Sequence, residues 1–334
     1  MFYWGILGAG RIARKFVAAV QQSGSTTALA VASRERARAE AFARETGVPR
    51  AYGSYEALLA DPEVHGVYVA TPNSLHAEWA IAAARAGKHV LCEKPIGATL
   101  AEAEAMFAAA REHGVWLMEA FMYRFHPQTL RVQELLGSGA VGQVHMVRTD
   151  FGFVLDRPAD VRWRADLAGG ALMDVGCYCV SFARMVVGEA PARVSAAARW
   201  SASGVDQLLA ATLEYPGGAV AQIACDYITS FHQTAQVLGS DGVLSLERAF
   251  TMPPDQPSSI QLWRGAHFAQ QETIVIAPAN HYRLEAEGFA ALTRAGHGAH
   301  GLPEMPLVET LDNMATIEAL LMSAREGRPV DVYS

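Results

Sequence analysis

The hydrophobic pattern of the first third of the chain predicts short buried strands that alternate with amphipathic helices. It begins with an apolar run at 2–7 and a helical pattern that extends to about residue 22. Further strands are expected at 27–32, near 52, and at 66–70, 89–93 and 115–121, with helices at 35–46, 54–60, from 74 and at 99–113. Because such alternation is typical of βαβ units, we expect a parallel sheet of about six strands.

From about residue 140 the pattern changes to long stretches in which apolar and polar residues alternate. The expected strands are 141–153, 192–200, 208–215, 219–227, 234–239, 243–247 and 260–264. Turns such as Tyr215-Pro216-Gly217-Gly218 join several of them, which is typical of antiparallel hairpins. We therefore expect a large, mostly antiparallel open sheet with one face free for a partner subunit, and hence a homodimer or a higher homo-oligomer.

Two helices complete the predicted second half. One, at about 171–187, interrupts the strands, and the last, at 307–326, carries apolar residues at helical spacing. We expect the last helix to return to the interface between the domains. The change of pattern divides the chain into a nucleotide-binding domain, 1–122, and a substrate-binding and oligomerisation domain, 123–334.

The composition describes a globular protein, with 51% hydrophobic and 18% charged residues. A net charge of −7 without any basic block argues against nucleic acid as a partner. The four cysteines fit a reducing compartment, and Cys177 and Cys179 point to different faces of a helix, so we expect no metal site or disulfide there. We find no apolar run of transmembrane length and no room for a signal peptide, and we expect a cytoplasmic protein without a membrane partner.

Gly8-Ala9-Gly10-Arg11-Ile12-Ala13 follows the first strand and opens the first helix. This is the G-x-G-x-x-A pattern of dinucleotide-binding Rossmann domains. Gly8 permits the tight turn, Gly10 lets the backbone approach a pyrophosphate at the helix N-terminus, and Ala13 takes the third small position. The fold class is therefore α/β, with an N-terminal Rossmann domain and a C-terminal α+β domain.

The second strand ends in Ser33-Arg34, where an NAD-binding domain usually carries an Asp or Glu for the ribose 2′-hydroxyl. A hydroxyl and a planar guanidinium suit a 2′-phosphate, and Arg38 lies one turn further along the next helix. The alternative is that these arginines only form the solvated face of that helix. The sequence favours NADP over NAD.

Glu93-Lys94-Pro95 lies at the carboxyl end of a buried strand, the edge at which open α/β sheets bind their ligands. Pro95 disfavours helix at the preceding residue, so Lys94 should stay extended. Lys94 is a candidate proton carrier or substrate clamp.

Thr71-Pro72-Asn73 ends another strand at the same edge. Asn73 and His76 are candidates for contact with the nicotinamide ribose or ring, although His76 fits a surface histidine equally well. The complete set of cofactor-binding candidates is Gly8, Gly10, Arg11, Ile12, Ala13, Ser33, Arg34, Arg38, Thr71, Pro72, Asn73, His76, Glu93 and Lys94.

Asp174 and Tyr178 lie one turn apart on the predicted helix 171–187 and face the same way. An ionisable pair on an otherwise apolar helix needs a polar neighbour. For the tyrosine alone, a core position with a satisfied hydroxyl is the competing interpretation, and the nearby aspartate weakens it. Arg124, Phe125, Phe153, Trp163 and Arg164 are candidates for the substrate pocket, and each fits simple packing at a domain junction equally well.

In their order and separation, the glycine turn, Glu93-Lys94-Pro95 and the segment from Gly169 to Tyr178 resemble the glucose–fructose oxidoreductase/inositol dehydrogenase (Gfo/Idh/MocA) family. Tyr178, where many members carry a histidine, and residues 118–127 resemble the branch of dimeric dihydrodiol dehydrogenases and NADP-dependent D-xylose dehydrogenases. The resemblance implies a Rossmann domain and an open-sheet domain often used for dimerisation. It also implies that Lys94 and the helix residue Tyr178 flank the nicotinamide.

A mechanism follows from these residue types. Oxidation of an alcohol removes a hydride from carbon and a proton from oxygen, and free tyrosine, with a pKa near 10, accepts a proton poorly at pH 7. We hypothesise that Tyr178 is the acid/base, that Lys94 lowers its pKa and polarises the substrate oxygen, and that Asp174 orients the substrate or the lysine. The alternative has Lys94 as proton carrier and Tyr178 as hydrogen-bond donor.

Three functions compete. The leading one is an NADP-dependent dehydrogenase or reductase acting on CH–OH groups of a sugar, polyol or vicinal diol. The second is a ketone reductase acting on a keto- or anhydro-sugar, and the third is a non-catalytic NADP-sensing regulatory protein. The intact pair of Lys94 and Tyr178 weighs against the sensor, since a sensor needs no proton relay.

Overall fold

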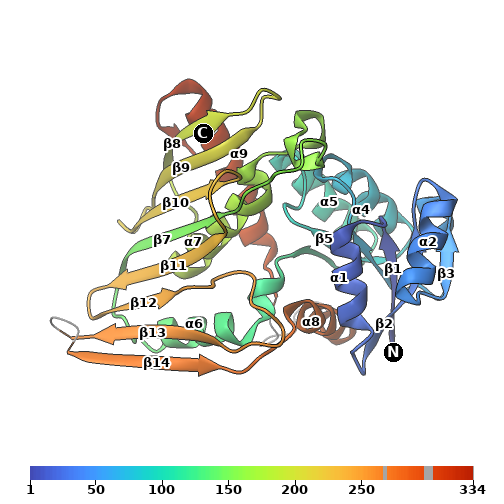
Figure 1. Cartoon of the computed structure of the whole chain (residues 1–334), viewed down its shortest axis with the longest axis horizontal. Helices are drawn as coiled ribbons and strands as arrows, with labels where there is room; N and C mark the ends of the chain where they lie inside the picture. Colours follow the sequence, from blue (N-terminus) through green and yellow to red (C-terminus); the bar gives the residue numbers. More distant parts are fainter. Residues whose placement is uncertain (266–268, 297–303, 334) are drawn as a thin grey trace. The chain divides into compact units, whose positions relative to one another are not determined.

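The computed structural model describes residues 1–265, 269–296 and 304–333. These residues form two compact units, whose elements are shown in Figure 1. The first unit comprises Met1–Phe125 and Asn280–Leu307, and the second comprises His126–Ala279 and Val308–Ser334. Each unit contains one sheet and the helices that pack on it.

The sheet of the first unit has six parallel strands in the order β3-β2-β1-β4-β5-β6. The strands are β1 (Phe2–Leu7), β2 (Thr26–Ala32), β3 (Arg50–Tyr52), β4 (Gly66–Val69), β5 (His89–Glu93) and β6 (Leu117–Ala120). The strand order reverses between β1 and β4, and in doubly wound sheets the ligand crevice lies at the carboxyl ends of the strands at this point. The predicted parallel sheet is confirmed.

The predicted helices of the first unit are present, within a few residues of the expected bounds. They are α1 (Arg11–Val20), α2 (Arg36–Thr46), α3 (Tyr55–Leu59), α4 (His76–Arg85) and α5 (Leu100–Glu112), with a 3₁₀ turn η1 (Asn73–Leu75) before α4. Local chemistry sets their ends: the Ser54 and Thr99 side chains cap α3 and α5, and Gly47 ends α2 in the left-handed conformation.

Helix α8 (His281–Ala295) follows the second sheet in the chain but packs in the first unit, against α1 and the short helix η2 (Met122–Phe125). The Phe289 ring lies 5.5 Å from that of Trp4, and Gly288 is so close to Phe125 that a Cβ there would lie 2.7 Å from the ring. The prediction that all of 123–334 belongs to the second domain is therefore corrected, because α8 completes the first core.

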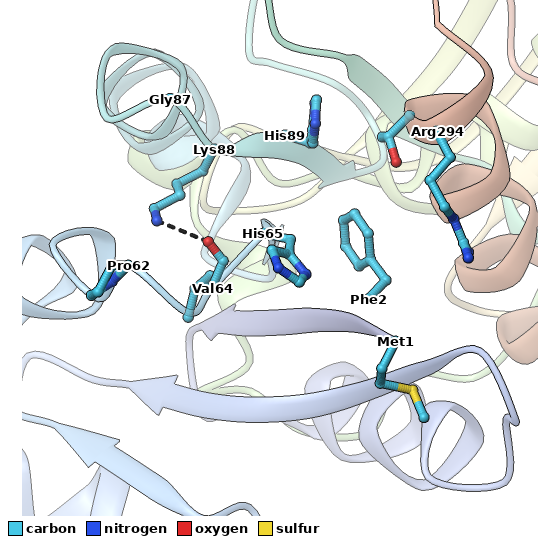
Figure 2. Close-up of a pocket in the computed structure, with 10 residues that line it drawn as sticks. Met1, Phe2, Pro62, Val64, His65, Gly87, Lys88, His89 and Arg294 are labelled. Carbon is cyan, nitrogen blue, oxygen red and sulfur yellow. Dashed lines mark hydrogen bonds between the residues drawn. The ribbon is translucent and has the colours of Figure 1, made fainter.

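A pocket opens at the amino ends of β1, β4 and β5 in the first unit (Figure 2). This edge of the sheet is opposite the carboxyl edge to which the glycine turn and Lys94 belong. The pocket had no counterpart among the sequence predictions.

The second unit is built on a nine-stranded sheet in the order β14-β13-β12-β11-β7-β10-β9-β8-β15. The strands are β7 (Val144–Gly152), β8 (Arg193–Trp200), β9 (Asp206–Glu214), β10 (Val220–Asp226), β11 (His232–Gly239), β12 (Gly242–Leu246), β13 (Ser258–Arg264), β14 (Gln270–Ile276) and β15 (Val330–Asp331). Only β7 and β10 pair in parallel among these strands, so the predicted mostly antiparallel sheet is confirmed.

The helices of the second unit are α6 (Pro127–Gly137), the 3₁₀ turns η3 (Val161–Trp163) and η4 (Ala165–Leu167), the π-helical turn η5 (Leu172–Gly176), α7 (Cys177–Val187) and α9 (Leu307–Glu326). The helix predicted at 171–187 is thus a π turn followed by an α-helix. Helix α7 packs on β7 and β10. Cys177 and Cys179 are buried and form no disulfide within the described residues, and their thiols donate to two different carbonyls, those of Asp174 and Ala224.

Helix α9 groups with the second unit, where Asp312 accepts a hydrogen bond from Arg184 at 2.7 Å. Its return to an interface between the domains stays a prediction. Helices α6 and α8 and strands β14 and β15 were not predicted from the sequence.

One segment among the described residues, Ala165–Val187, is long and apolar enough to cross a membrane by composition alone, with a mean hydropathy of 1.4. The expectation that no apolar run reaches this length is therefore wrong. Within the structure 78% of this window is buried, and it is interrupted by η4 and η5. The segment is apolar because α7 forms the core beneath the second sheet.

Candidate functional site

The turn after β1 has the shape that the glycine motif predicts. Gly8 has φ +110°, and a Cβ there would lie 2.6 Å from the carbonyl oxygen of Ala70, so this position accepts only glycine. Gly10 caps α1 with extended backbone, and a Cβ there would meet nothing within 4 Å. Open space beside Gly10, at the N-terminus of α1, suits an approaching phosphate.

The carboxyl edge of β2 carries two arginines without an ion pair in the part of the chain that the structure describes. Arg34 and Arg38 are exposed, whereas Arg36 between them pairs with Glu40 at 2.9 Å. Burial raises the pKa of Tyr55, and the charges of Arg34 and Arg38 oppose that rise, so both guanidinium groups lie near this one ring. The pair is therefore available to an anion at the end of β2.

His76 is buried, so the interpretation as a surface histidine is wrong. Its Nδ1 lies 2.9 Å from the carbonyl oxygen of Pro95 and its Nε2 3.0 Å from that of Thr71. Burial lowers the pKa of His76 to about 4, so the ring is neutral at pH 7. The ring therefore joins the turn after β4 to the turn after β5, and a direct contact between a ring nitrogen and nicotinamide would require one of these bonds to break.

Buried carboxylates hold the turn that contains Lys94. Glu93 accepts hydrogen bonds from the Tyr68 hydroxyl and, at 3.2 Å, from the backbone N–H of Lys94. Glu119 accepts from the backbone N–H of Ile96 at 3.0 Å. The Lys94–Pro95 peptide between them is cis. The sequence did not single out Tyr68 or Glu119, although an acidic residue inside a buried strand is a signal that could have drawn attention to Glu119.

In the second unit, Asp174 has a charged partner that was not predicted. Arg162 donates through Nε to Asp174 at 2.5 Å and through a terminal nitrogen to Asp160 at 3.2 Å. The Asp174 carboxylate raises the pKa of Arg162, mainly through Coulomb attraction. From the sequence, the neighbours Trp163 and Arg164 were proposed instead. Arg162, Trp163 and Arg164 are adjacent on one loop, and no local motif indicates which of them meets Asp174.

Tyr178 is buried in an aromatic cluster at the start of α7. Its ring lies edge-on to Phe151 at 5.5 Å and beside Phe250 at 5.4 Å. Asp174 lies within the π turn η5, and Tyr178 follows it in the first turn of α7. Turns of this kind inside helices occur frequently at functional sites.

Three contacts fix the start of η5. Asp206 accepts a hydrogen bond from the Leu172 N–H at 2.7 Å, and the Tyr227 hydroxyl donates to the Gly170 carbonyl at 2.8 Å. Gly170 has φ +120°, and a Cβ there would lie 2.2 Å from Asp206. Asp206 is therefore the group that positions the segment carrying Asp174.

The remaining substrate candidates are divided between the two units. Arg124 and Phe125 are buried in the first unit, where Phe125 packs on α8. In the second unit, Trp163 and Phe153 lie edge-on to Tyr227 at 5.2 and 5.4 Å, and Arg164 pairs with Asp166. Trp163 and Arg164 also line a pocket of about 580 Å³.

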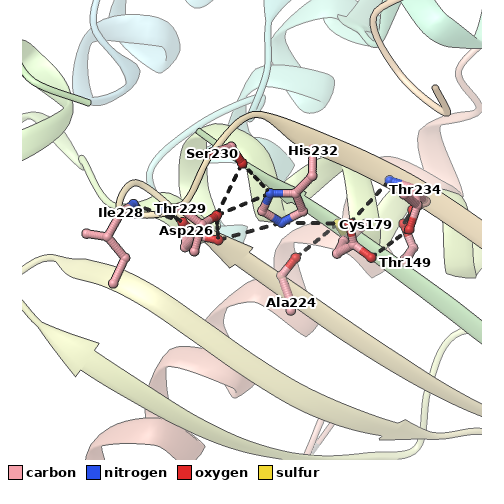
Figure 3. A network of polar contacts seen from close by, with 10 residues as sticks. Thr149, Cys179, Ala224, Asp226, Ile228, Thr229, Ser230, His232 and Thr234 are labelled. Carbon is pink, nitrogen blue, oxygen red and sulfur yellow. Dashed lines mark hydrogen bonds and ion pairs between the residues drawn. The ribbon is translucent and has the colours of Figure 1, made fainter. Parts of the chain in front are cut away.

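A further polar network, not predicted from the sequence, lies at the ends of β7, β10 and β11 (Figure 3). His232 Nε2 lies 3.6 Å from Asp226 and 3.7 Å from Asp150, and Thr229 donates to Asp226 at 2.9 Å. Gly152 leaves room for these groups, since a Cβ there would lie 2.4 Å from both Asp226 and His232. The network fixes the β10–β11 connection next to Phe151, on which Tyr178 packs.

The geometry thus gathers the candidates into two sets. Gly8, Gly10, Ser33, Thr71 and Lys94 end or follow the central strands of the first sheet, while Asp174 and Tyr178 belong to the second unit. Contact between Lys94 and Tyr178, and the roles of all these residues, stay predictions. The fold and the glycine turn define a dinucleotide-binding protein of the Rossmann class.

Comparison with known families agrees with this class. Residues 2–121 match the model described as "Oxidoreductase family, NAD-binding Rossmann fold", and residues 129–245 match the GFO/IDH/MocA C-terminal domain. The chain belongs to the Gfo/Idh/MocA family of oxidoreductases, as the motifs had indicated.

Individual relatives cover most or all of the chain. A D-xylose 1-dehydrogenase (NADP⁺) from Haloferax volcanii is 42% identical over 98% of this chain and 99% of its own length. A trans-1,2-dihydrobenzene-1,2-diol dehydrogenase from Mus musculus is 40% identical over 73% of this chain and 74% of its own. A 3-ketoreductase from Actinomadura kijaniata, solved with NADP and TDP-benzene, is 30% identical with a TM-score of 0.88 over 96% of this chain and 97% of its own. That enzyme has also been solved with a tyrosine replaced by phenylalanine and with a lysine replaced by alanine.

Asp206 makes the stability of the second unit depend on pH. Burial raises its pKa to about 6 from 3.8, so between about pH 4 and 6 the folded state holds a proton that the unfolded chain has lost. The contribution of Asp206 to stability therefore falls as pH rises through this window, by an amount on the order of 3 kcal/mol. We expect Asp206→Asn to gain stability relative to the wild type across the same window.

Urea unfolding at a series of pH values measures this difference. Asp255→Asn, at an exposed aspartate, is the matched control and should follow the wild type. A difference between Asp206→Asn and the wild type that stays constant from pH 4 to 7 would contradict the assignment.

Proposed function

We propose that this protein is an NADP-dependent oxidoreductase that transfers hydride between the nicotinamide and the hydroxyl-bearing or carbonyl carbon of a sugar, polyol or vicinal diol. The observation that carries the proposal is the near full-length similarity, at 42% identity, to an NADP-dependent D-xylose dehydrogenase. The glycine turn and Lys94 at one sheet edge supply the matching chemistry. The proposed location is the cytoplasm, whose reducing conditions suit four buried cysteines that form no disulfide in the described structure.

The chain's own residues would move the proton. Bound NADP⁺ supplies the hydride acceptor, and NADPH the donor. Tyr178 accepts the hydroxyl proton, while the Lys94 ammonium lowers the pKa of the phenol and polarises the substrate oxygen. Asp174, held by Arg162, orients the substrate. The second allocation, with Lys94 carrying the proton and Tyr178 donating a hydrogen bond, uses the same pair.

Replacing the proposed acid/base tests the mechanism. We expect Tyr178→Phe to lower turnover at least about 100-fold while NADPH binding is unchanged, because the ring and its packing remain and only the hydroxyl is lost. Turnover is followed at 340 nm with NADP⁺ and a panel of aldoses, polyols and diols, and cofactor binding by NADPH fluorescence.

Tyr215→Phe is the matched control, because the Tyr215 hydroxyl is buried in the same unit and has no hydrogen-bond partner among the residues that the structure describes. It should leave turnover near the wild-type value. Near-normal turnover in Tyr178→Phe would refute its assignment as acid/base. A wild-type protein that binds NADPH but turns over none of the panel would favour the NADP sensor.

Reduction of a keto-sugar is a second candidate function. The observation that favours it is the similarity to a 3-ketoreductase that covers 96% of this chain. Trp163 and Arg164, which line the 580 Å³ pocket of the second unit, are the residues we propose for sugar contact. Oxidation of NADPH with keto-sugars in the same assay distinguishes the two directions.

Arg34 and Arg38 are proposed to select NADP over NAD. Each offers an exposed guanidinium to the 2′-phosphate, and a hydrogen bond to a charged group contributes about 1.5–3 kcal/mol. We therefore expect Arg34→Ala to raise the KM for NADP⁺ roughly 10- to 100-fold and to leave the KM for NAD⁺ nearly unchanged. Steady-state kinetics with both cofactors measures the ratio.

Arg36→Ala is the control, since Arg36 is already paired with Glu40. It should change neither KM. An equal rise of both KM values in Arg34→Ala would show that the arginine does not read the 2′-phosphate.

We propose that the second sheet forms a homodimer through its partly exposed face. Register places five apolar residues side by side across five strands on that face: Trp263, Val243, Leu238, Met146 and Val220. Residues paired in this way point to the same side of a sheet, and all five are partly exposed. A continuous apolar row of this kind is typical of a surface covered by a partner.

A charge in the middle of this row should disrupt the dimer. We expect Leu238→Lys to shift the protein from dimer to monomer in analytical ultracentrifugation, because two copies of the lysine would be buried without partners. Met322→Lys, at an exposed apolar residue of α9, is the control and should stay dimeric. A wild-type monomer, or an unchanged dimer in Leu238→Lys, would refute this interface.

A further inference from the structure

The pocket at the amino edge of the first sheet is separate from the proposed cofactor site. Its cavity volume is about 520 Å³, within the range of small-molecule sites. It lies where β1, β4 and β5 begin, at Phe2, next to His65 and at His89, whereas the glycine turn and Lys94 follow the other ends of these strands. At about 3.3 Å per residue, the six residues of β1 place the two edges roughly 20 Å apart.

Two histidines in this pocket have their proton positions fixed by the backbone. His65 Nδ1 accepts from the N–H of Tyr3 at 3.1 Å, and His89 Nδ1 accepts from the N–H of Trp116 at 3.0 Å. In both neutral rings the proton therefore sits on Nε2, which makes each ring a donor through that atom. Figure 2 shows both rings around Phe2.

Two basic side chains, Lys88 and Arg294, lie on opposite sides of the pocket (Figure 2). Lys88 is buried and donates to the carbonyls of Asp61 at 2.7 Å and Val64 at 2.8 Å, and its ammonium has a third N–H. Arg294, exposed in the last turn of α8, donates through Nε to the carbonyl of Ala290 at 2.8 Å, and its terminal nitrogens carry further N–H donors.

No acidic side chain is among the described residues that line the pocket. Burial, together with nearby positive charge that includes Lys88, lowers the pKa of His65. Phe2 and Val64 add an apolar surface. Hydrogen-bond donors, positive charge and an apolar wall in one pocket are the features of a site for an organic anion.

We propose that this pocket is a second ligand site, which binds a small organic anion through a phosphate or carboxylate group held by Arg294 and His65, while Lys88 adds positive charge on the other side of the pocket. The site is independent of the proposed hydride transfer. It makes no use of the glycine turn or of Lys94.

Histidine NMR on the full chain tests the proposal. The protein is saturated with NADPH, so that the proposed 2′-phosphate and pyrophosphate contacts are occupied, and is then titrated with inorganic phosphate and, separately, with citrate. The imidazole signal of His65 is assigned with His65→Asn. We expect a saturable shift of this signal with a Kd of about 1 mM or tighter for at least one anion. A preference for phosphate identifies phosphate esters as the ligand class, and a preference for citrate identifies polycarboxylates.

Arg294→Glu should weaken this binding at least about 10-fold, and Arg294→Gln should weaken it less, because the first reverses the charge and the second only removes it. Arg111→Glu is the matched control, an exposed arginine in the last turn of α5 in the same unit, and should bind as the wild type does. The absence of a saturable shift with either anion would overturn the proposal. So would equal affinity in Arg294→Glu and the wild type, or equal weakening in Arg111→Glu.

Discussion

The close approach of Gly8 to the carbonyl oxygen of Ala70 is the constraint on which the first unit depends. The N–H of Gly8 donates to Ala32 at 3.1 Å, while its Cα lies against the end of β4. One residue without a side chain thus brings together the ends of β1, β2 and β4. Since the strand order reverses between β1 and β4, this meeting point shapes the crevice in which a dinucleotide would lie. Any Cβ at this position would force the strand ends apart.

The groups around Lys94 show how a sheet edge becomes a rigid site. Glu93 and Glu119 bind backbone N–H groups on either side of Pro95, and neutral His76 ties the same turn to Thr71. Burial of a carboxylate costs free energy unless the group is hydrogen-bonded. Glu93 and Glu119 are hydrogen-bonded to backbone N–H groups, so their role is to hold the backbone of this turn. The lysine is then presented by a turn that has little freedom to move.

Local patterns were sufficient to predict most strands and helices, since a buried strand such as β5 and an amphipathic helix such as α1 leave their period in the sequence. Strand β14 was missed because its first residues, Gln270-Gln271-Glu272, are polar and largely exposed. Helix α8 contains Gly288, and its apolar face is complementary to a core formed by residues far away in the chain. Glycine is required at 288 because the ring of Phe125 packs against it, and the sequence does not show where that ring lies.

The same distinction applies to the candidate site. Residues within one motif, such as Gly8 and Gly10, were predicted because their spacing is itself the signal. Partners that meet only through folding were not predicted. Arg162 binds Asp174, and Asp206 in strand β9 binds the backbone N–H of Leu172. His76 lay between two interpretations for the same reason, because its burial depends on the turn after β5.

The position of α8 also bears on the order in which the protein folds during synthesis. The first core is incomplete until Phe289 reaches Trp4, and the chain visits the second unit between Phe125 and Asn280 before it returns. Domains commonly fold in order as they leave the ribosome, but here the amino-terminal sheet must wait, with an apolar face uncovered, while the later sheet is being made. A nascent chain of this protein is therefore a natural client for chaperones that bind exposed apolar surface, until α8 has been synthesised.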